Sequence, residues 1–187
     1  HTNEIAQSEA YLGHKWCNYW FHVHHLNDRA GKMSKSKGEF LTVSLLKSKG
    51  YDPRVYRLFC LQSHYRKPLE FSFDALDNAR AAYEKLVKRV GGLKKEGGSV
   101  DPEKFAAYKA RFEEALCDDL NTSMALTVIY DMLKDEMSDA TKYALAEDFD
   151  RVLSLNLTTA YASMEAEANG DVDAETERYI LEKIEER

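Results

Sequence analysis

The sequence is 187 residues long, with 44% hydrophobic, 31% charged and 11% aromatic residues, a balance typical of soluble proteins with one or two small domains. It has no run of about 18 consecutive apolar residues, so we expect no transmembrane helix and no membrane partner. The first residues do not resemble a signal peptide. Three cysteines, none of them in CxxC spacing, argue against a disulfide framework and favour a cytoplasmic protein.

The net charge of −6 is divided unevenly along the chain. Residues 1–100 contain 17 Lys and Arg against 10 Asp and Glu, which gives +7, whereas residues 101–187 contain 9 against 22, which gives −13. Clustered basic residues attract phosphate, so we expect a nucleotide or tRNA to bind at the first half. The acidic half has a simpler alternative explanation, which is a solvated helical surface.

The first 70 residues predict mixed secondary structure. We expect a helix from Glu4 to Trp20, and a strand from Trp20 to Leu26, where aromatic and β-branched residues concentrate. A turn over residues 27–31 should follow. Two further helices are expected, one through Leu45, Leu46 and Lys49 and one from Pro53 to Leu61. A chain that starts in this way indicates the last part of an α/β domain.

The rest of the chain predicts helices. The first runs from Asp74 to Gly91-Gly92 and the second starts at Pro102, after a linker over residues 94–102. The third starts at Asn121-Thr122, and a fourth follows. We expect these last two helices to bury Met124, Val128, Ile129, Met132, Leu133, Leu145, Phe149, Val152 and Leu153. Residues 161–172 predict a mobile loop, and a final helix is expected from Asp173. Short connections favour an antiparallel bundle.

The residues that follow the expected strand form a loop suited to phosphate. Lys32 and Lys35 supply positive charge, Ser34 and Ser36 supply hydroxyl donors, and the glycines on either side let the loop close. The loop lacks the GxxxxGK[ST] spacing of a Walker motif. A solvent-facing Lys/Ser loop without a ligand is the alternative explanation.

The histidines permit a second hypothesis. On a strand, His22 and His24 share a face and could bind a metal, but no carboxylate or cysteine stands at an obvious ligand spacing. Half-buried packing residues are therefore the alternative, and for His24 and His25 the favoured one. The cysteines have no base at a recognisable spacing, so we expect them to be small apolar residues.

The exact sequence of the lysine loop carries a resemblance to a known family. Residues 32–36, Lys-Met-Ser-Lys-Ser, resemble the signature loop of class I aminoacyl-tRNA synthetases. Residues 1–10 resemble the HHxNEIAQSEA segment of cysteinyl-tRNA synthetases. Segments further along resemble the same family in the same order: 18–22, 52–53, 63–66, 118–122 and 152–155. The resemblance spans roughly the whole chain.

The resemblance implies a fold and an activity. It implies that residues 1–72 are the C-terminal end of a Rossmann-type catalytic domain with a stem-contact region. It also implies that residues 73–187 are a tRNA-binding helical bundle of the DALR type, so that the fold is mainly α. The implied enzyme joins cysteine to ATP as cysteinyl-adenylate and transfers it to tRNA(Cys). The resemblance further indicates a fragment, which lacks the N-terminal part of the catalytic domain and the C-terminal end, and which is inactive alone.

The resemblance also implies roles for individual residues. Lys35 would contact ATP directly, Lys32 would meet the phosphates, and Ser34 and Ser36 would donate hydrogen bonds to them. His22 would lie near the nucleotide. Glu4 matches the family's glutamate ligand to zinc, but the histidine that would join it precedes His1, so we expect zinc in the whole enzyme and not in this fragment.

Two other functions remain open. The cysteine-ligating enzyme of mycothiol synthesis resembles the same family, shares the lysine loop and forms an adenylate, but has no tRNA partner. A non-catalytic module that only binds tRNA belongs to a different class. Dependence of the full-length protein on tRNA would distinguish them.

Overall fold

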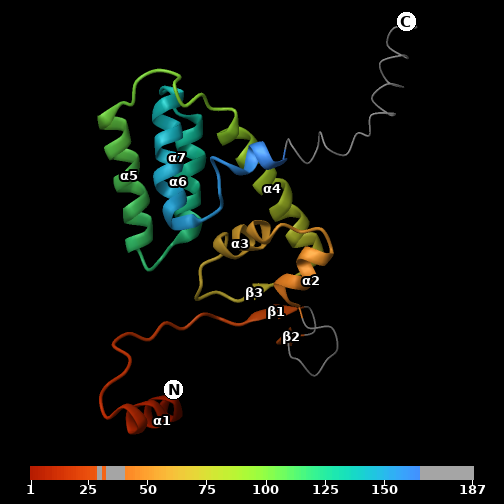
Figure 1. The fold of residues 1–187 in the computed structure, drawn as a ribbon, viewed down its shortest axis with the longest axis vertical. Helices are drawn as coiled ribbons and strands as arrows, with labels where there is room; N and C mark the ends of the chain where they lie inside the picture. The colour runs from red at the N-terminus through yellow and green to blue at the C-terminus, as the bar shows by residue number, and fades with distance from the viewer. Residues whose placement is uncertain (29–30, 33–40, 165–187) are drawn as a thin grey trace, which may run out of the picture.

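The computed structural model describes residues 1–28, 31–32 and 41–164 (Figure 1). Seven labelled helices and three short strands lie in these ranges: α1 (Thr2–Leu12), β1 (Leu26–Asp28), β2 (Gly31–Lys32), α2 (Val43–Ser48), α3 (Pro53–Leu61), β3 (Leu69–Glu70), α4 (Phe73–Gly91), α5 (Pro102–Cys117), α6 (Thr122–Lys134) and α7 (Asp139–Leu153). Residues 160–164 are also helical, so the loop expected over residues 161–172 is wrong for 161–164. The rest of that loop and the helix expected from Asp173 lie outside the described residues. No helix within these ranges is long and apolar enough to cross a membrane.

The helices from α2 to α7 start where the sequence supplies a capping side chain. In each of them, a side-chain oxygen just before the helix accepts a hydrogen bond from a backbone N–H of the first turn, and the capping residues are Thr42, Asp52, Ser72, Asp101, Asn121 and Ser138. A cap of this kind satisfies a donor that the helix cannot. Pro53 and Pro102 stand at the first positions of their helices, where no amide hydrogen is needed. The predicted helices in this part are therefore confirmed.

The N-terminal region departs from the prediction. The first helix ends at Leu12 instead of Trp20, because Gly13 takes a left-handed conformation (φ 72°) and its N–H caps the helix at the Glu9 carbonyl, 2.8 Å away. The expected strand from Trp20 to Leu26 is also wrong, since β1 starts only at Leu26. A strand needs a paired neighbour, and in the described structure the backbone of residues 20–25 bonds to another segment through the His24 N–H, 2.8 Å from the Tyr65 carbonyl.

The three strands form one small sheet in the order β2-β1-β3. β1 pairs with β2 in antiparallel fashion, with Asn27 opposite Lys32, and with β3 in parallel fashion, with Leu26 opposite Leu69. The Phe71 N–H extends the second pairing with a 2.7 Å bond to the Asn27 carbonyl. The central strand thus joins the start of the lysine loop to the segment that leads into α4.

One hydrophobic core holds the helices together. It extends from Leu46 in α2 to Ala160 and includes residues of every helix from α2 to α7. α3 packs on α4, and α5, α6 and α7 stand side by side (Figure 1). Phe112 of α5 and Phe149 of α7 stack with ring centroids 4.1 Å apart. The core crosses the boundary predicted at residues 72 and 73, so that division into two domains stays a prediction.

Two expected core residues are exposed. Met124 in the first turn of α6 and Val152 in the last turn of α7 both face solvent, although they fit the apolar spacing of their helices. The other seven residues that we expected in the core of these helices are buried. Periodicity identifies which face of a helix is apolar. The neighbouring helices leave part of that face uncovered in the first turn of α6 and the last turn of α7, at Met124 and Val152.

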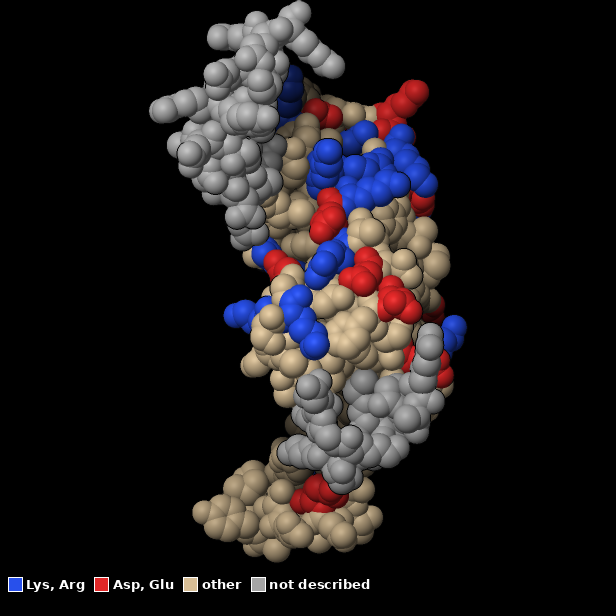
Figure 2. Space-filling view, turned by 90° about the vertical axis from the view of Figure 1, so that its right-hand side faces the viewer, with Lys and Arg blue, Asp and Glu red and all other residues tan. Residues whose placement is uncertain are grey.

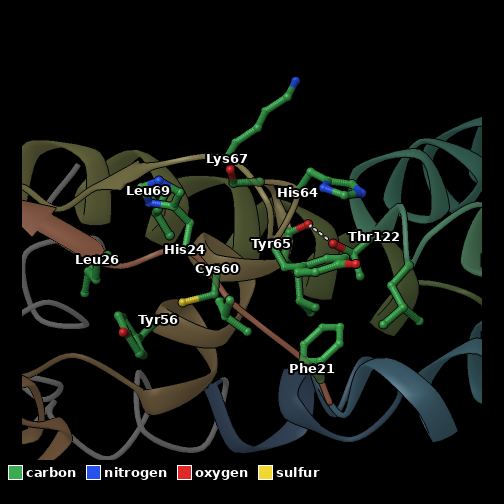
Figure 3. Close-up of a pocket in the computed structure, with 14 residues that line it drawn as sticks. Phe21, His24, Leu26, Tyr56, Cys60, His64, Tyr65, Lys67, Leu69 and Thr122 are labelled. Atoms are coloured by element: carbon green, nitrogen blue, oxygen red, sulfur yellow. Dashed lines mark hydrogen bonds between the residues drawn. The ribbon is translucent and has the colours of Figure 1, made fainter. Parts of the chain in front are cut away.

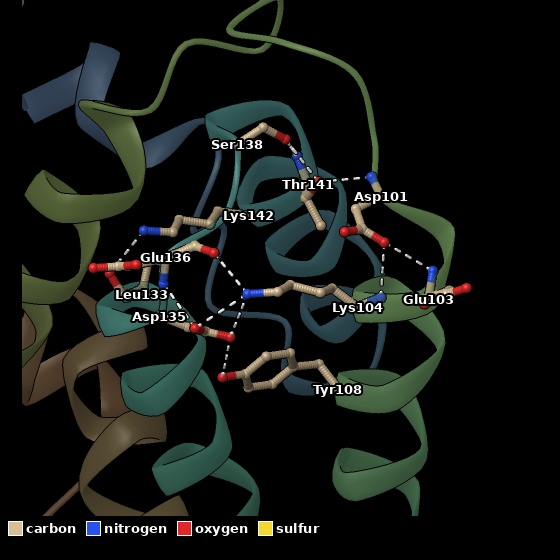
Figure 4. Close-up of polar contacts among 10 residues, drawn as sticks. All are labelled: Asp101, Glu103, Lys104, Tyr108, Leu133, Asp135, Glu136, Ser138, Thr141 and Lys142. Carbon is tan, nitrogen blue, oxygen red and sulfur yellow. Dashed lines mark hydrogen bonds and ion pairs between the residues drawn. The ribbon is translucent and has the colours of Figure 1, made fainter.

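A polar cluster closes one end of the bundle (Figure 4). The Lys104 ammonium of α5 lies 3.2 Å from Asp135 Oδ2 and 2.6 Å from the Glu136 carbonyl, just after α6. Tyr108 donates a 3.1 Å hydrogen bond to the same Asp135 oxygen. The bond from Lys104 lowers the pKa of Asp135. The Asp135 carboxylate at the end of α6 is therefore bound by two side chains of α5, Lys104 and Tyr108.

Candidate functional site

The lysine loop leaves the sheet at its edge. Gly31 and Lys32 form the edge strand β2, opposite Asp28 and Asn27 of β1. Ser34, Lys35 and Ser36 lie outside the described residues, so their contacts cannot be compared with the prediction. The described backbone places the start of the loop one strand away from β3, the strand that precedes α4.

The histidine and glutamate predictions lie near the N-terminus. The ring nitrogens His1 Nε2 and His22 Nδ1 are 3.0 Å apart, and the His1 ring stacks on Trp20 with centroids 4.8 Å apart. Glu4 is exposed in the first turn of α1, with its carboxylate 3.7 Å from the terminal ammonium of His1. The structure therefore brings His22 to His1, and pairs Glu4 with the N-terminus.

The residues that the structure describes do not fit a complete zinc site. Nowhere among them do three His, Cys, Asp or Glu side chains gather at metal-binding distance, and zinc sites in proteins use three or four such ligands. All three cysteines are free. Burial raises the pKa of Cys60, which disfavours the thiolate that a metal would need.

A cavity of about 300 Å³ lies between the extended N-terminal segment and α3 (Figure 3). Its walls are mainly apolar and come from Phe21, Val23, Leu26, Tyr56, Cys60, Leu61, Leu69 and Leu120. Burial raises the pKa of Tyr56 to about 12. The cavity is thus hydrophobic in chemistry, and it borders the turn that carries His64, Tyr65 and Lys67.

The two basic residues of this turn have different surroundings. The Arg66 guanidinium donates two hydrogen bonds to the Asp119 carboxylate, at 2.6 Å and 3.1 Å. Lys67 points away from the cavity (Figure 3), and its ammonium has no ion-pair partner among the described side chains. Lys67 is therefore available to a phosphate, whereas Arg66 is already paired.

A group of cations that the charge arithmetic missed lies where α4, α6 and α7 meet. Arg89 and Lys142 each donate a 3.2 Å hydrogen bond to the Leu133 carbonyl near the end of α6. We define the basic cluster as these two residues with their neighbours in the helices and in the adjoining linker: Lys85, Lys88, Arg89, Lys95, Lys134 and Lys142. Lys95 lies over the ring of Tyr143 in α7, 5.2 Å from its centroid.

The basic cluster lacks ion pairs within the described part of the chain. None of its six members forms an ion pair with a carboxylate in the described part of the chain, although six other Lys and Arg side chains there do. Figure 2 shows Lys and Arg side chains gathered on the upper part of one face of the molecule. The spacing of Lys85, Lys88 and Arg89 on one helix was the sequence signal. The sequence alone did not reveal the whole cluster, because Lys134 and Lys142 belong to residues 101–187, whose net charge is −13.

Comparison with known proteins gives two family matches. Residues 1–81 match the family described as tRNA synthetases class I (C) catalytic domain, and residues 111–155 match the DALR domain. The first match covers α1 to α3, the sheet and the first half of α4, and the second covers the end of α5, α6 and α7.

Individual relatives agree with these family matches. The chain is 41% identical over 169 residues to a cysteine–tRNA ligase of Novosphingobium aromaticivorans, covering 84% of the chain and 34% of the relative. It is 40% identical over 159 residues to one of Thermococcus gammatolerans (79% and 32%), and 36% identical over 198 residues to one of Alkalilimnicola ehrlichii (100% and 42%). The chain spans about a third of the length of the curated relatives it matches.

These matches, together with the sheet, the lysine loop and the bundle, define the class: the chain belongs to the class I tRNA synthetases. Within that class it belongs to the cysteine–tRNA ligase family, because relatives of that name match along most of its length. The predicted fold, mainly helical with the end of a class I catalytic domain followed by a DALR helical domain, is confirmed.

Proposed function

We propose that this chain is part of a cysteine–tRNA ligase, which activates cysteine with ATP and transfers it to tRNA(Cys). The observation that carries the proposal is the sequence Lys-Met-Ser-Lys-Ser at residues 32–36. It starts in the edge strand of a sheet within the segment that matches a class I catalytic domain. We also propose that the chain is inactive alone, because it spans about a third of its relatives.

The lysine loop supplies positive charge where the reaction develops negative charge. Adenylation of an amino acid releases pyrophosphate from ATP, and cationic groups that meet the leaving oxygens lower the barrier. In this proposal Lys35 contacts ATP directly, Lys32 meets the phosphates, and Ser34 and Ser36 donate hydrogen bonds to them. His22 lies near the nucleotide.

Glu4 remains a predicted zinc ligand of the whole enzyme. Its side chain is 60% exposed, which leaves the carboxylate accessible to a metal ion. Among the described residues, no group of three His, Cys, Asp or Glu side chains could hold the metal together with it.

The tRNA contacts of this chain lie on the basic cluster and on Lys67. These side chains form no ion pair with a carboxylate among the described residues, and each is exposed or half-buried. Phosphates of a folded RNA would release counterions from such a surface on binding, so the affinity should fall as salt rises. Three free thiols are consistent with a protein that works in the cytoplasm.

The experiment uses the full-length product of the gene that encodes this chain. We expect cysteine-dependent exchange of pyrophosphate into ATP, and then cysteine attached to tRNA(Cys). Exchange without transfer to tRNA would favour the mycothiol-type ligase. Binding of tRNA without exchange would leave only a tRNA-binding module.

A further inference from the structure

Asp119 joins two segments that are far apart in the sequence. It lies in the connection between α5 and α6, and its carboxylate accepts hydrogen bonds from the Tyr65 hydroxyl and from two nitrogens of Arg66, at 2.6 Å and 3.1 Å. His64 Nε2 lies 3.7 Å from the same carboxylate. Three consecutive side chains of the turn after α3 therefore converge on one group of the bundle.

The backbone around Asp119 is unusual. Asp119 and Leu120 both have positive φ, 51° and 55°, in the left-handed region that disfavours residues with a Cβ. Leu120 is half-exposed, so burial of its side chain does not explain the conformation. The connection is instead held by the contacts of Asp119 and by the Thr122 hydroxyl, which donates a 2.7 Å bond to the Leu61 carbonyl at the end of α3.

These contacts lie between the basic cluster and the lysine loop. The connection leads directly into α6, whose far end carries the basic cluster at the Leu133 carbonyl. The turn leads into β3, which pairs with β1 beside the start of the lysine loop. Tyr65 also accepts the backbone bond from His24, two residues before β1. Asp119 therefore makes one of the contacts between the start of α6 and the turn that leads into β3.

The contact is better suited to orientation than to stability. The side chains of Arg66 and Asp119 are 65% and 45% exposed, and exposed ion pairs contribute little to the stability of a fold. A planar guanidinium that donates two hydrogen bonds to one carboxylate does fix the relative orientation of the two side chains. The Tyr65 hydroxyl donates a third hydrogen bond to the same carboxylate from another direction. Together the three bonds fix the orientation of the bundle relative to the turn.

We propose that Asp119 is a positioning residue that sets the DALR bundle relative to the sheet of the lysine loop. Its contribution is to the transfer of the activated amino acid to tRNA, which touches both parts, and not to activation, which takes place on the catalytic side. This proposal rests on the proposed function.

The test substitutes Asp119 in the full-length protein. In Asp119→Asn we expect the turnover number for charging of tRNA(Cys) to fall by about tenfold, the size of a typical coupling between two sites. Pyrophosphate exchange should stay within about twofold of wild type, and the melting temperature should not change. Asp119→Glu, which keeps the charge, should recover part of the loss. Asp118→Asn is the matched control, because that carboxylate accepts a hydrogen bond from the side-chain amide of Asn121, 3.5 Å away, within the same connection.

Each outcome decides between the explanations. Unchanged charging in Asp119→Asn would overturn the positioning role, and so would a parallel loss of charging, exchange and melting temperature, which indicates a folding role. A wild-type protein without exchange would overturn the proposed function instead. The positioning role would then be judged by hydrogen exchange of the 187-residue chain. Asp119→Asn should speed exchange of the Lys67 and Phe71 amides, and an unchanged rate there contradicts the proposal.

Discussion

At the scale of single residues, the bundle depends on one buried hydroxyl. Thr141 in the first turn of α7 is fully buried, and its hydroxyl accepts a 2.9 Å hydrogen bond from the Asp101 N–H at the start of α5. It also shares a 2.7 Å bond with the hydroxyl of Ser138, the cap of α7. Two helix starts therefore share one polar atom, and no buried side-chain polar atom in the described part lacks a partner.

Replacement of Thr141 by valine tests this arrangement. Valine keeps the volume but leaves the Asp101 N–H and the Ser138 hydroxyl without this partner, so we expect the free energy of unfolding to fall by about 1–3 kcal/mol. Urea denaturation of the chain measures the change. Thr127→Val is the control, because the Thr127 hydroxyl is exposed and bonds to the Ser123 carbonyl of its own helix. An equal effect of the two substitutions would contradict the role given to Thr141.

The pKa of Asp119 gives a second prediction for a single residue. Hydrogen bonds from Arg66 and Tyr65 lower this pKa to about 2, whereas an unfolded aspartate titrates near about 4. A lowered pKa in the folded state means that the contact is fully present above about pH 4 and is lost as the pH falls toward 2. Carboxyl NMR titration should find the midpoint of Asp119 well below the ordinary aspartate value of about 4. A midpoint near 4 for Asp119 would show that the ion pair does not form.

At the scale of helices and strands, the sequence predicted the helix starts correctly but did not predict which segments pair as strands. The starts of α3, α5 and α6 follow from Asp52-Pro53, Asp101-Pro102 and Asn121, because a cap or a proline acts within one turn. The strand expected at residues 20–26 failed, because a strand depends on a neighbour that local composition does not reveal. The site was predicted in the same uneven way. The sequence of the lysine loop marks it directly, whereas the basic cluster forms only when three helices are brought together.

The lysine loop is the element whose substitution should affect chemistry most. In the full-length enzyme we expect Lys35→Ala to lower the rate of pyrophosphate exchange by about 10²–10³-fold with little change in cysteine binding, because its charge acts on the leaving pyrophosphate. Lys37→Ala is the control, since that lysine follows the five-residue signature. A wild-type rate of pyrophosphate exchange in Lys35→Ala would contradict the role proposed for Lys35.

At the scale of the whole molecule, net charge and charge placement differ. The half with a charge of −13 contributes Lys134 and Lys142 to the basic cluster, while many of its other cations are paired with carboxylates, as Lys104, Lys109 and Arg111 are. Pairing removes those cations from the field that a polyanion meets. The acidic surface and a binding face for RNA can therefore belong to the same bundle.

The basic cluster should dominate the affinity of the chain for RNA. We expect Lys88→Ala with Lys142→Ala to weaken tRNA binding and to lower the slope of log affinity against log salt by about 1.5 to 2. The loss should be the same for cognate and non-cognate tRNA, because phosphate contacts carry no sequence information. Lys109→Ala is the control, since Asp148 lies 2.7 Å from its ammonium. Titrations at several salt concentrations measure both quantities, and an unchanged slope would exclude this surface.

The exposed N-terminal segment determines what optical probes can report. The chain contains two tryptophans, and both lie between α1 and β1: Trp16, 44% exposed, and Trp20, 38% exposed, with their rings in edge-to-face contact. Tryptophan emission will therefore follow this segment, whereas far-ultraviolet circular dichroism will follow the helices. The two signals need not change together during denaturation. Emission spectra offer a way to detect a molecule that covers the segment, without a label and without interference from the bundle.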